Sequence, residues 1–593
     1  MAKIVPAFFK EPPELLTGPQ NAAGKLKEEI MGFIRVVLFF AIVFLFFVAC
    51  TPIKIPSNPV LPVALKHWSD KTGVPLLADL GGYSHAVTTQ NPAAQRYFDQ
   101  GLVMSFAFNH GESIRSFHAA QMFDGNCAMC YWGEALALGP NINVTSNGQV
   151  VMDEEAHNQA YKAIQKATSL KAQASVRERD YIDALAVRYS SDASKSRSDL
   201  DMAYMHAMRK LFRKYPEDDD VAALLAESVM NTMPWDYWVN PETPKALMVE
   251  VIDALETVLQ RSPRHPLALH LYIHAVEASS KPERAERAAD TLRDLIPGAG
   301  HLVHMPSHIY WRVGRYNDAV EANFKAAAID EAYIAACHVQ SYYAATYYPH
   351  NLHFLWAAYS MEGRSQAAIE TAQKVAASVS DEMIVNFPAV EFFKTIPLLS
   401  LINFGQWSDV LMQPPPADHM EFSHGIWRYA RAIANTRLGD FDAARAEYSM
   451  LATLRKTANL ALLDAQDYPA TLLLQIADKL VEGEIFMARR DFAKAIASFK
   501  EAVLIQNQLP YTEPPYWYYP TQLSLGKALL EAGDYAQAEM VYLDNLKHYP
   551  RNGWALYGLK QSLQAQDKDF SEIQSEFDRA WQNADVSLTA SRF

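Results

Sequence analysis

The sequence predicts an all-α protein, a solenoid of stacked antiparallel helix pairs, on three observations. Apolar residues make up 50% of the chain and only 24 of its 593 residues are glycine, which favours helices over sheets. A small residue is followed twelve positions later by alanine, and four positions after that by an aromatic residue, at several places along the chain. The turn within each unit also repeats. Such internal similarity is typical of repeat proteins.

The first 49 residues are predicted to be a signal peptide. An apolar run at 36–49 follows Arg35. This length suits the core of a signal peptide, whereas a membrane-spanning helix needs about 20 residues. Because Glu28 and Glu29 are unsuited to the positive flank, we hypothesise that translation starts at Met31. An uncleaved anchor helix is the alternative interpretation.

The apolar run ends in the letters FVAC at 47–50, which resemble the lipobox of bacterial lipoproteins. The resemblance implies cleavage before Cys50 and lipidation of its thiol. It also implies a location in the bacterial cell envelope, attached to the membrane by the lipid. Thr51 at the next position favours the outer membrane, facing the periplasm. Residues 50–91 contain five prolines and are predicted to form a tether between lipid and solenoid.

The solenoid is predicted for residues 92–575, with clear repeats at 300–560, degenerate repeats at 140–260 and a C-terminal tail at 576–593. The turn inside the helix pair reads GRYNDA at 314–319, GDFDAA at 439–444, RDFAKA at 490–495 and GDYAQA at 533–538. The clearest units are Gly483 with Ala495 and Phe499, Gly526 with Ala538 and Tyr542, and Ala432 with Ala444 and Tyr448.

These units resemble the tetratricopeptide repeat (TPR) family. In that family two helices approach closely through small side chains, and the aromatic residue fills the gap to the next repeat. The resemblance implies that the first helix of each pair lines a concave groove. It also implies that the groove binds a partner, which in this setting is an envelope or periplasmic protein or peptide.

Histidines concentrate in one part of the predicted solenoid. Nine of the 18 lie between His265 and His353, where an even spread would place about three. When each first helix is aligned on its small packing residue, seven histidines share one stripe about 60° wide. The carboxylate of Glu277 follows on the same face. The stripe consists of His270, His274, His301, His304, His308, His350 and His353.

Neutral imidazole is a common ligand for zinc, copper and iron, and two histidines one helical turn apart can chelate one ion. The seven histidines with Glu277 are therefore predicted to bind a transition metal, zinc or copper being favoured. Peptide or polar-ligand binding and plain packing remain as alternatives. Pro306 interrupts the second helix of this cluster, so we expect either a late helix start or a kink there. A late start would place His301 and His304 on a turn.

Cys127 and Cys130 form a C-x-x-C on the same stripe, beside Trp132. Tyr131 follows the second cysteine, so the motif is not a haem-attachment site. A disulfide, a soft metal-ligand pair and two packed thiols remain as alternatives. Aromatic clusters at 233–238 and 513–520 are interpreted as plugs and loops between repeats.

The sequence excludes several functions more firmly than it identifies one. A formal charge of −14 without a basic stripe argues against nucleic acid. No serine-hydrolase elbow, P-loop or dinucleotide-binding motif is present. Three functions remain: an envelope-anchored metalloprotein, a scaffold that binds protein or peptide without metal, and a metal-dependent enzyme. No residue is assigned a catalytic role.

Overall fold

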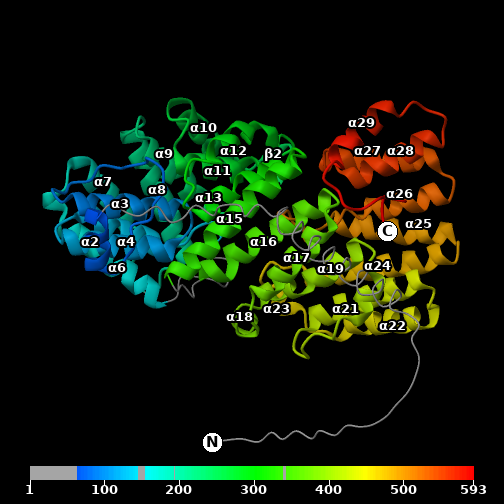
Figure 1. Cartoon of the computed structure of the whole chain (residues 1–593). Coiled ribbons are helices and arrows are strands. Elements are labelled where there is room, and N and C mark those ends of the chain that lie inside the picture. The colour runs from blue at the N-terminus through cyan, green and yellow to red at the C-terminus, as the bar shows by residue number, and fades with distance from the viewer. Residues whose placement is uncertain (1–62, 144–153, 193, 338–341) are drawn as a thin grey trace, which may run out of the picture. The chain divides into compact units, whose positions relative to one another are not determined.

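The computed structural model describes residues 63–143, 154–192, 194–337 and 342–593, all within one compact unit. Helices run through this unit from one end to the other (Figure 1). The predicted signal peptide and Cys50 lie outside the described residues. Among the described helices, none is both long enough and apolar enough to span a bilayer. Within the described ranges the only sheet is a hairpin of β1 (Trp238–Asn240) and β2 (Thr243–Pro244), antiparallel with Trp238 opposite Pro244.

The N-terminal half of the unit contains short and medium helices. They are α2 (Val63–Thr72), α3 (Pro92–Phe106), α4 (His110–Phe123), α5 (Ala128–Leu138), α6 (Glu154–Ser169), η1 (Lys171–Gln173), α7 (Val176–Ala186), α8 (Arg197–Lys214), α9 (Asp219–Met230), α10 (Ala246–Arg261), α11 (Pro266–Val276), η2 (Pro282–Ala285), α12 (Glu286–Leu292), α13 (Gly300–His304) and α14 (Pro306–Arg312).

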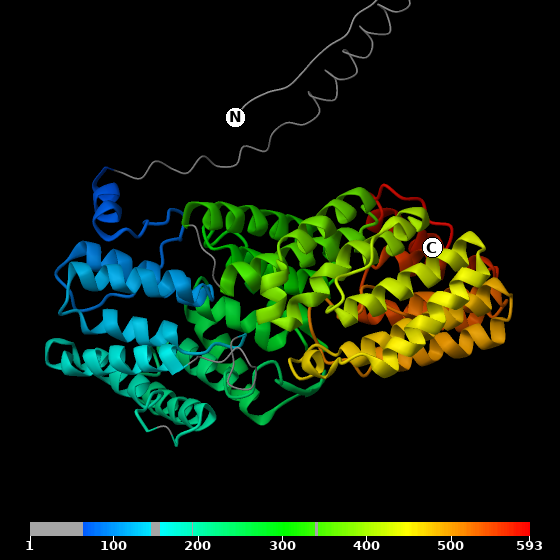
Figure 2. The ribbon, with the colours of Figure 1, turned by 90° about the horizontal axis from the view of Figure 1, so that it is seen from below.

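The C-terminal half follows the same up-and-down path and includes the longest helices (Figure 2). They are α15 (Tyr316–Cys337), α16 (Tyr342–Met361), α17 (Ser365–Ala377), α18 (Asp381–Asn386), η3 (Pro388–Thr395), α19 (Ile396–Asn403), α20 (Trp407–Met412), α21 (Glu421–Leu438), α22 (Phe441–Thr457), α23 (Ala461–Asp464), α24 (Ala470–Ala488), α25 (Phe492–Gln506), α26 (Gln522–Glu531), α27 (Tyr535–His548), α28 (Gly553–Gln564) and α29 (Ser571–Ala580).

Consecutive helices pack in pairs through the residues that the repeat pattern identified. A Cβ atom on Gly483 in α24 would lie 2.4 Å from the ring of Phe499 in α25. The ring of Tyr542 in α27 fills the space beside both Gly526 and Gly558, at 2.4 and 2.2 Å from their would-be Cβ atoms. These glycines allow each helix pair to close on an aromatic ring. The predicted fold class is confirmed: the chain is an all-α, TPR-type solenoid.

The repeated turn has a local physical cause. Gly439 and Gly533 adopt φ values of 84° and 83°, the left-handed region that glycine enters without steric cost. The next residue, Asp440 or Asp534, caps the following helix by accepting a hydrogen bond from its third backbone N–H group. Arg490 stands at the equivalent glycine position and adopts a φ of 58°. One turn geometry therefore recurs along the C-terminal repeats.

The close packing at Gly526 predicts a strong response to a larger side chain. The substitution Gly526→Val places methyl groups where the Tyr542 ring lies, and we expect it to lower the free energy of unfolding by about 1–3 kcal/mol. Urea unfolding followed by circular dichroism measures the change. Gly111→Ala is the matched control, because no atom lies within 4 Å of its would-be Cβ in helix α4. Equal losses in both variants would contradict the packing argument.

Two predicted boundaries differ from the structure. Residues 63–91, expected to be tether, carry α2 and bury Leu76 and Leu80. The Gln100 side chain accepts a hydrogen bond of 2.8 Å from Leu77 N, which anchors this segment to α3. The expected tail is also packed, since Arg592 is buried and donates to Asn403 Oδ1 over 2.6 Å. Both segments pack on the solenoid through individual side-chain contacts. Such contacts leave no periodic signal in the sequence.

Candidate metal centre

Four helices bring six imidazoles and one carboxylate together. Helix α11 provides His270 and His274, and Glu277 is its C-terminal capping residue. Helix α13 carries the next two histidines, α14 one and α16 one. All are buried except the half-buried histidine on α16. The cluster consists of His270, His274, Glu277, His301, His304, His308 and His350, and we call it the histidine cluster.

The cluster contains two groups of three imidazoles. In the first group, one ring nitrogen from each of His270, His274 and His301 lies within 4.8 Å of the other two. The Nε2 atoms of His270 and His301 are 3.2 Å apart. The Nε2 atom of His274 and the Nδ1 atom of His301 are buried, and neither has a hydrogen-bond partner. The first group thus leaves two buried imidazole nitrogens unsatisfied, an arrangement that is costly without a ligand.

The second group consists of His304, His308 and His350, again with one donor atom from each within 4.8 Å of the others. The Nε2 atoms of His304 and His308 are 2.9 Å apart. The ring centroids of His304 and His350 are 4.8 Å apart. The rings of the two groups are neighbours, since the centroids of His301 and His304 are 5.8 Å apart.

Glu277 joins the two groups. Its Oε1 atom accepts a hydrogen bond of 2.8 Å from His274 Nδ1, and its Oε2 atom accepts one of 2.6 Å from His308 Nδ1. The Glu277 backbone carbonyl in turn accepts a hydrogen bond from Arg312. One carboxylate therefore orients an imidazole of each group. It also lies close enough to both rings to form a third potential ligand set with them.

Hydrogen bonds at Nδ1 fix the tautomers of four imidazoles. His270 Nδ1 donates to the carbonyl of Phe106 over 2.7 Å, and His304 Nδ1 donates to Asn323 Oδ1 over 2.6 Å. The Asn323 oxygen is the acceptor because its amide nitrogen donates to the Ala319 carbonyl. With His274 and His308 bound to Glu277, all four rings turn Nε2 away from these acceptors. Second-sphere acceptors of this kind orient histidine ligands in metal sites.

Electrostatics keep most of these imidazoles neutral. Burial lowers the pKa of His270, His301, His304 and His350 well below the usual value, and neighbouring imidazoles lower it further. Burial also lowers the pKa of His274, although Glu277 opposes this effect. Neutral imidazole is the form that binds a metal.

The pair formed by Glu277 and His308 is the exception. Burial opposes the charge on each, but their mutual attraction wins: the pKa of Glu277 is lowered and the pKa of His308 is raised. A protonated His308 donates from Nδ1 to Glu277 and from Nε2 to the lone pair of His304 Nε2. In the second group, a proton therefore occupies a position where a cation could bind.

The structure resolves the interruption at Pro306. Helix α13 ends at His304 and α14 begins at Pro306, where the missing N–H group would have had no helical partner. Met305 between them keeps helical angles, with φ −49° and ψ −38°. Of the two alternatives for Pro306, the one that would place His301 and His304 on a turn does not apply, because both belong to the short helix α13.

His353 lies outside the three potential ligand sets. Its ring stacks on Trp356 with centroids 5.4 Å apart and meets the edges of Phe392 and Phe393. The sequence stripe placed His353 beside His350, but three residues turn a helix by about 300°, so the two side chains still differ in direction by about 60°. Burial lowers the pKa of His353 to about 3.

The cluster is covered rather than open to a groove. Phe108, in the turn between α3 and α4, lies over the first group, with its centroid 4.5 Å from His270 and 5.4 Å from His301. The neighbouring carbonyl of Phe106 binds His270. The prediction that these histidines face an accessible concave surface is therefore wrong for all but His350, because a segment far away in sequence packs on them.

Three polar groups around the cluster were not predicted from the sequence. Asn323 in α15 and the Phe106 carbonyl carry no recognisable signal. Glu513 lies in the aromatic segment interpreted as a plug, and its Oε2 atom is 3.5 Å from His308 Nδ1. Burial, followed by repulsion from Glu277, raises the pKa of Glu513 well above its usual range. The proline-flanked glutamate at 513 was the one available hint.

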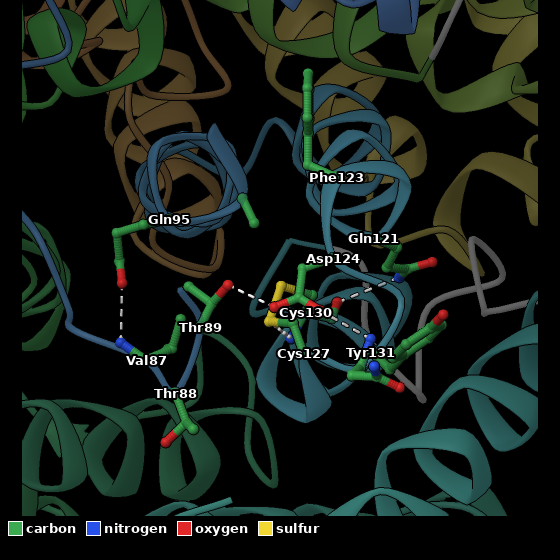
Figure 3. The surroundings of a disulfide bond; sticks show 12 residues. Val87, Thr88, Thr89, Gln95, Gln121, Phe123, Asp124, Cys127, Cys130 and Tyr131 are labelled. Atoms are coloured by element: carbon green, nitrogen blue, oxygen red, sulfur yellow. Dashed lines mark hydrogen bonds between the residues drawn. A yellow bond between two sulfur atoms is a disulfide. The ribbon is translucent and has the colours of Figure 1, made fainter. Parts of the chain in front are cut away.

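Cys127 and Cys130 form a disulfide at the start of α5 (Figure 3). Both residues are fully buried. Cys127 is the N-cap residue of α5, and its sulfur accepts a hydrogen bond of 3.2 Å from Cys130 N. The Cys130 carbonyl accepts from Gln121, and the adjacent Asp124 accepts from Thr89. Among the alternatives of the sequence analysis, the disulfide is the one that the structure contains.

Comparison with known proteins adds little to this picture. No protein-family model matches the chain, and no curated protein matches it. Among solved structures, the human IFIT1 dimer with m7Gppp-AAAA has a TM-score of 0.30 at 12% identity and covers 73% of this chain and 88% of its own. Yeast Tom70 has a TM-score of 0.27 at 12% identity, covering 83% and 92%. The TPR domain of P58(IPK) has a TM-score of 0.21 at 11% identity, covering 80% and 98%.

Proposed function

We propose that the chain is a transition-metal-binding solenoid protein, in which the histidine cluster binds two ions. The first ion would bind His270, His274 and His301, and the second would bind His304, His308 and His350. Glu277 would orient one ligand of each ion. The envelope location and the lipid at Cys50 remain part of the proposal, on the sequence alone.

The observation that carries the proposal is the direction of the ring nitrogens. Four imidazoles use Nδ1–H for fixed acceptors, so each directs Nε2 toward another partner, and His308 would do so for a metal once it loses its extra proton. Two imidazole nitrogens of the first group are buried without any partner. Ordinary packing would leave such groups hydrogen-bonded. A cation bound in the first group would give a partner to His274 Nε2 and to one ring nitrogen each of His270 and His301.

The spacing within each group is close to that of a coordination sphere. Zinc binds imidazole nitrogen at about 2.0–2.1 Å, so two ligands of one tetrahedral ion lie about 3.4 Å apart. The donor atoms of each group already lie within 4.8 Å of one another. Closing each group around an ion thus shortens the most widely separated donor pair by at most about 1.4 Å. The sphere of three neutral imidazoles suits zinc or copper and leaves one coordination position for a further ligand.

Metal titration of the full chain, without a histidine tag, tests the proposal. We expect about two equivalents of Zn²⁺ or Cu²⁺ per chain after chelator treatment and reloading, measured by mass spectrometry. Binding at the second group displaces the proton of His308, so proton release accompanies it. His270→Ala should remove one equivalent, His308→Ala one equivalent, and the double variant both.

The control is His419→Ala, since His419 is exposed and lies outside the histidine cluster. It should bind as much metal as the unmodified chain. Circular dichroism establishes that each variant is folded. If the folded wild-type chain binds neither metal, the metal proposal is wrong, and the alternative is a protein-binding scaffold without metal.

A further inference from the structure

A cavity lies directly beside the second group of the histidine cluster. Its volume is about 100 Å³. His350 and His353 of α16 form part of its wall, and residues 512–518 form another part. Residues of η3, α19 and α21 complete it, among them Leu399 and Ile426. Because His350 is both a member of the second group and a wall residue, the cavity gives access to an ion bound there.

One end of the cavity is aromatic. Tyr468 stacks on Phe392 with ring centroids 4.9 Å apart and meets the edge of Phe422 at 5.3 Å. Tyr516 approaches Tyr468 edge-on at 5.6 Å. All four rings line the cavity, together with Trp356 and Trp517. Such walls favour a flat apolar molecule, because aromatic rings gain from stacked and edge-to-face contacts beyond their buried area.

The other end is polar. His350 is half-buried, whereas the other two imidazoles of its group are fully buried. Glu513 also lines the cavity, and its Oε2 atom is buried without a hydrogen-bond partner. Its Oε1 atom accepts a hydrogen bond from Tyr511. Oε2 is therefore free to form a hydrogen bond with a hydroxyl group in the cavity.

The volume limits the size of an occupant. An apolar protein cavity of about 150 Å³ accommodates benzene. The space here is about two-thirds of that volume but is partly open. A single six-membered ring is therefore about the largest group that the cavity accepts, and any substituent would have to extend into its open part.

We propose that this cavity binds a one-ring aromatic alcohol, a phenol, with its ring against the aromatic end and its oxygen toward His350 and Glu513. The inference extends the proposed function, because the phenol oxygen would take the remaining position of the ion at His304, His308 and His350. A hydroxyl group matches both polar partners: it can form a hydrogen bond with Glu513 Oε2, and its oxygen can bind a cation.

Fluorine NMR of the full chain with 4-fluorophenol and 4-fluorotoluene tests the inference. Both probes have one ring and similar size, but only the phenol has an oxygen. We expect 4-fluorophenol to bind about 5- to 150-fold more tightly, since a buried polar group left unpaired costs about 1–3 kcal/mol. Glu513→Leu should reduce this preference, and Leu399→Trp, which fills the cavity, should abolish binding of both probes.

Metal content separates this inference from the proposed function. Leu399→Trp should retain its ions while losing the probes. Co²⁺-loaded protein should change its visible absorption on adding 4-fluorophenol, and His304→Ala should remove this change. If probes bind at the cavity but no metal does, the metal proposal alone fails.

The cavity proposal is overturned if metal binds and 4-fluorophenol does not. It is also overturned if 4-fluorophenol binding survives Leu399→Trp, or if both probes bind equally well to the unmodified chain. Ile426→Phe narrows the same cavity from α21 and replaces Leu399→Trp if that variant does not fold.

Discussion

Replacing Glu277 by glutamine is expected to lower the affinity for one of the two proposed ions by about 10–100-fold, the usual effect of losing a second-sphere acceptor. A carboxylate accepts hydrogen bonds with both oxygens, and Glu277 uses one for His274 and the other for His308. Glutamine keeps one carbonyl oxygen, while its amide group faces the second imidazole with N–H donors. That imidazole loses its acceptor. Competition with a chelator of known affinity measures both binding constants.

Glu277→Ala removes both acceptors and should lower the affinity for both proposed ions. Glu513→Gln is the matched control, because Glu513 is buried beside His308 without a hydrogen bond to it, at 3.5 Å from Nδ1, and its raised pKa favours the neutral form. A neutral amide replaces a neutral carboxyl there, so both metal affinities should remain within a factor of about three, a free-energy change of about 0.7 kcal/mol. If Glu277→Gln behaves like this control, the bridging role assigned to Glu277 is wrong.

His353→Phe is expected to protect the metal-free protein from mild acid. The folded-state pKa of His353 is lowered to about 3 by burial, whereas the unfolded chain titrates near 6.5. Between these values the unfolded state binds the extra proton, so the folded state loses stability as the pH falls. By pH 5 this loss amounts to about 2 kcal/mol relative to pH 7.5. Phenylalanine does not titrate and keeps the aromatic contacts with Trp356.

Urea unfolding of the wild type and the variant at both pH values gives the measurement. On going from pH 7.5 to pH 5, the free energy of unfolding of the wild type should fall by about 2 kcal/mol more than that of the variant, whatever their difference at pH 7.5. His419→Phe, at an exposed position, should show a constant difference. A constant difference for His353→Phe as well would mean that the imidazole reaches solvent in the folded state.

Much of the fold could be predicted because its determinants are periodic. Gly483, Gly526 and their partner rings recur at fixed spacing, and the predicted contacts agree with the structure. The boundaries were less accurate. The segment before residue 92 and the end of the chain pack through individual contacts such as those of Gln100 and Arg592. A periodic pattern in the sequence does not predict individual contacts of this kind.

The candidate site was predicted in part for the same reason. Helical phasing brought together histidines of neighbouring repeats, and six of the seven do lie in one cluster. Phasing could not show that the turn at Phe106 and Phe108 covers the cluster, because that contact joins residues more than 160 positions apart. Nor could it separate His353 from His350. A stripe 60° wide includes both the direction that faces the cluster and the direction that faces Trp356.

The cover provided by Phe108 has a kinetic consequence. Its ring lies against three imidazoles of the cluster, at centroid distances of 4.5, 5.4 and 6.4 Å. An ion could enter or leave the first group only when the turn between α3 and α4 opens locally. Exchange there would then follow the opening rate of this turn and be slow even for a weakly held ion. The second group, reached past His350, would exchange faster, so the two ions would dissociate in a fixed order.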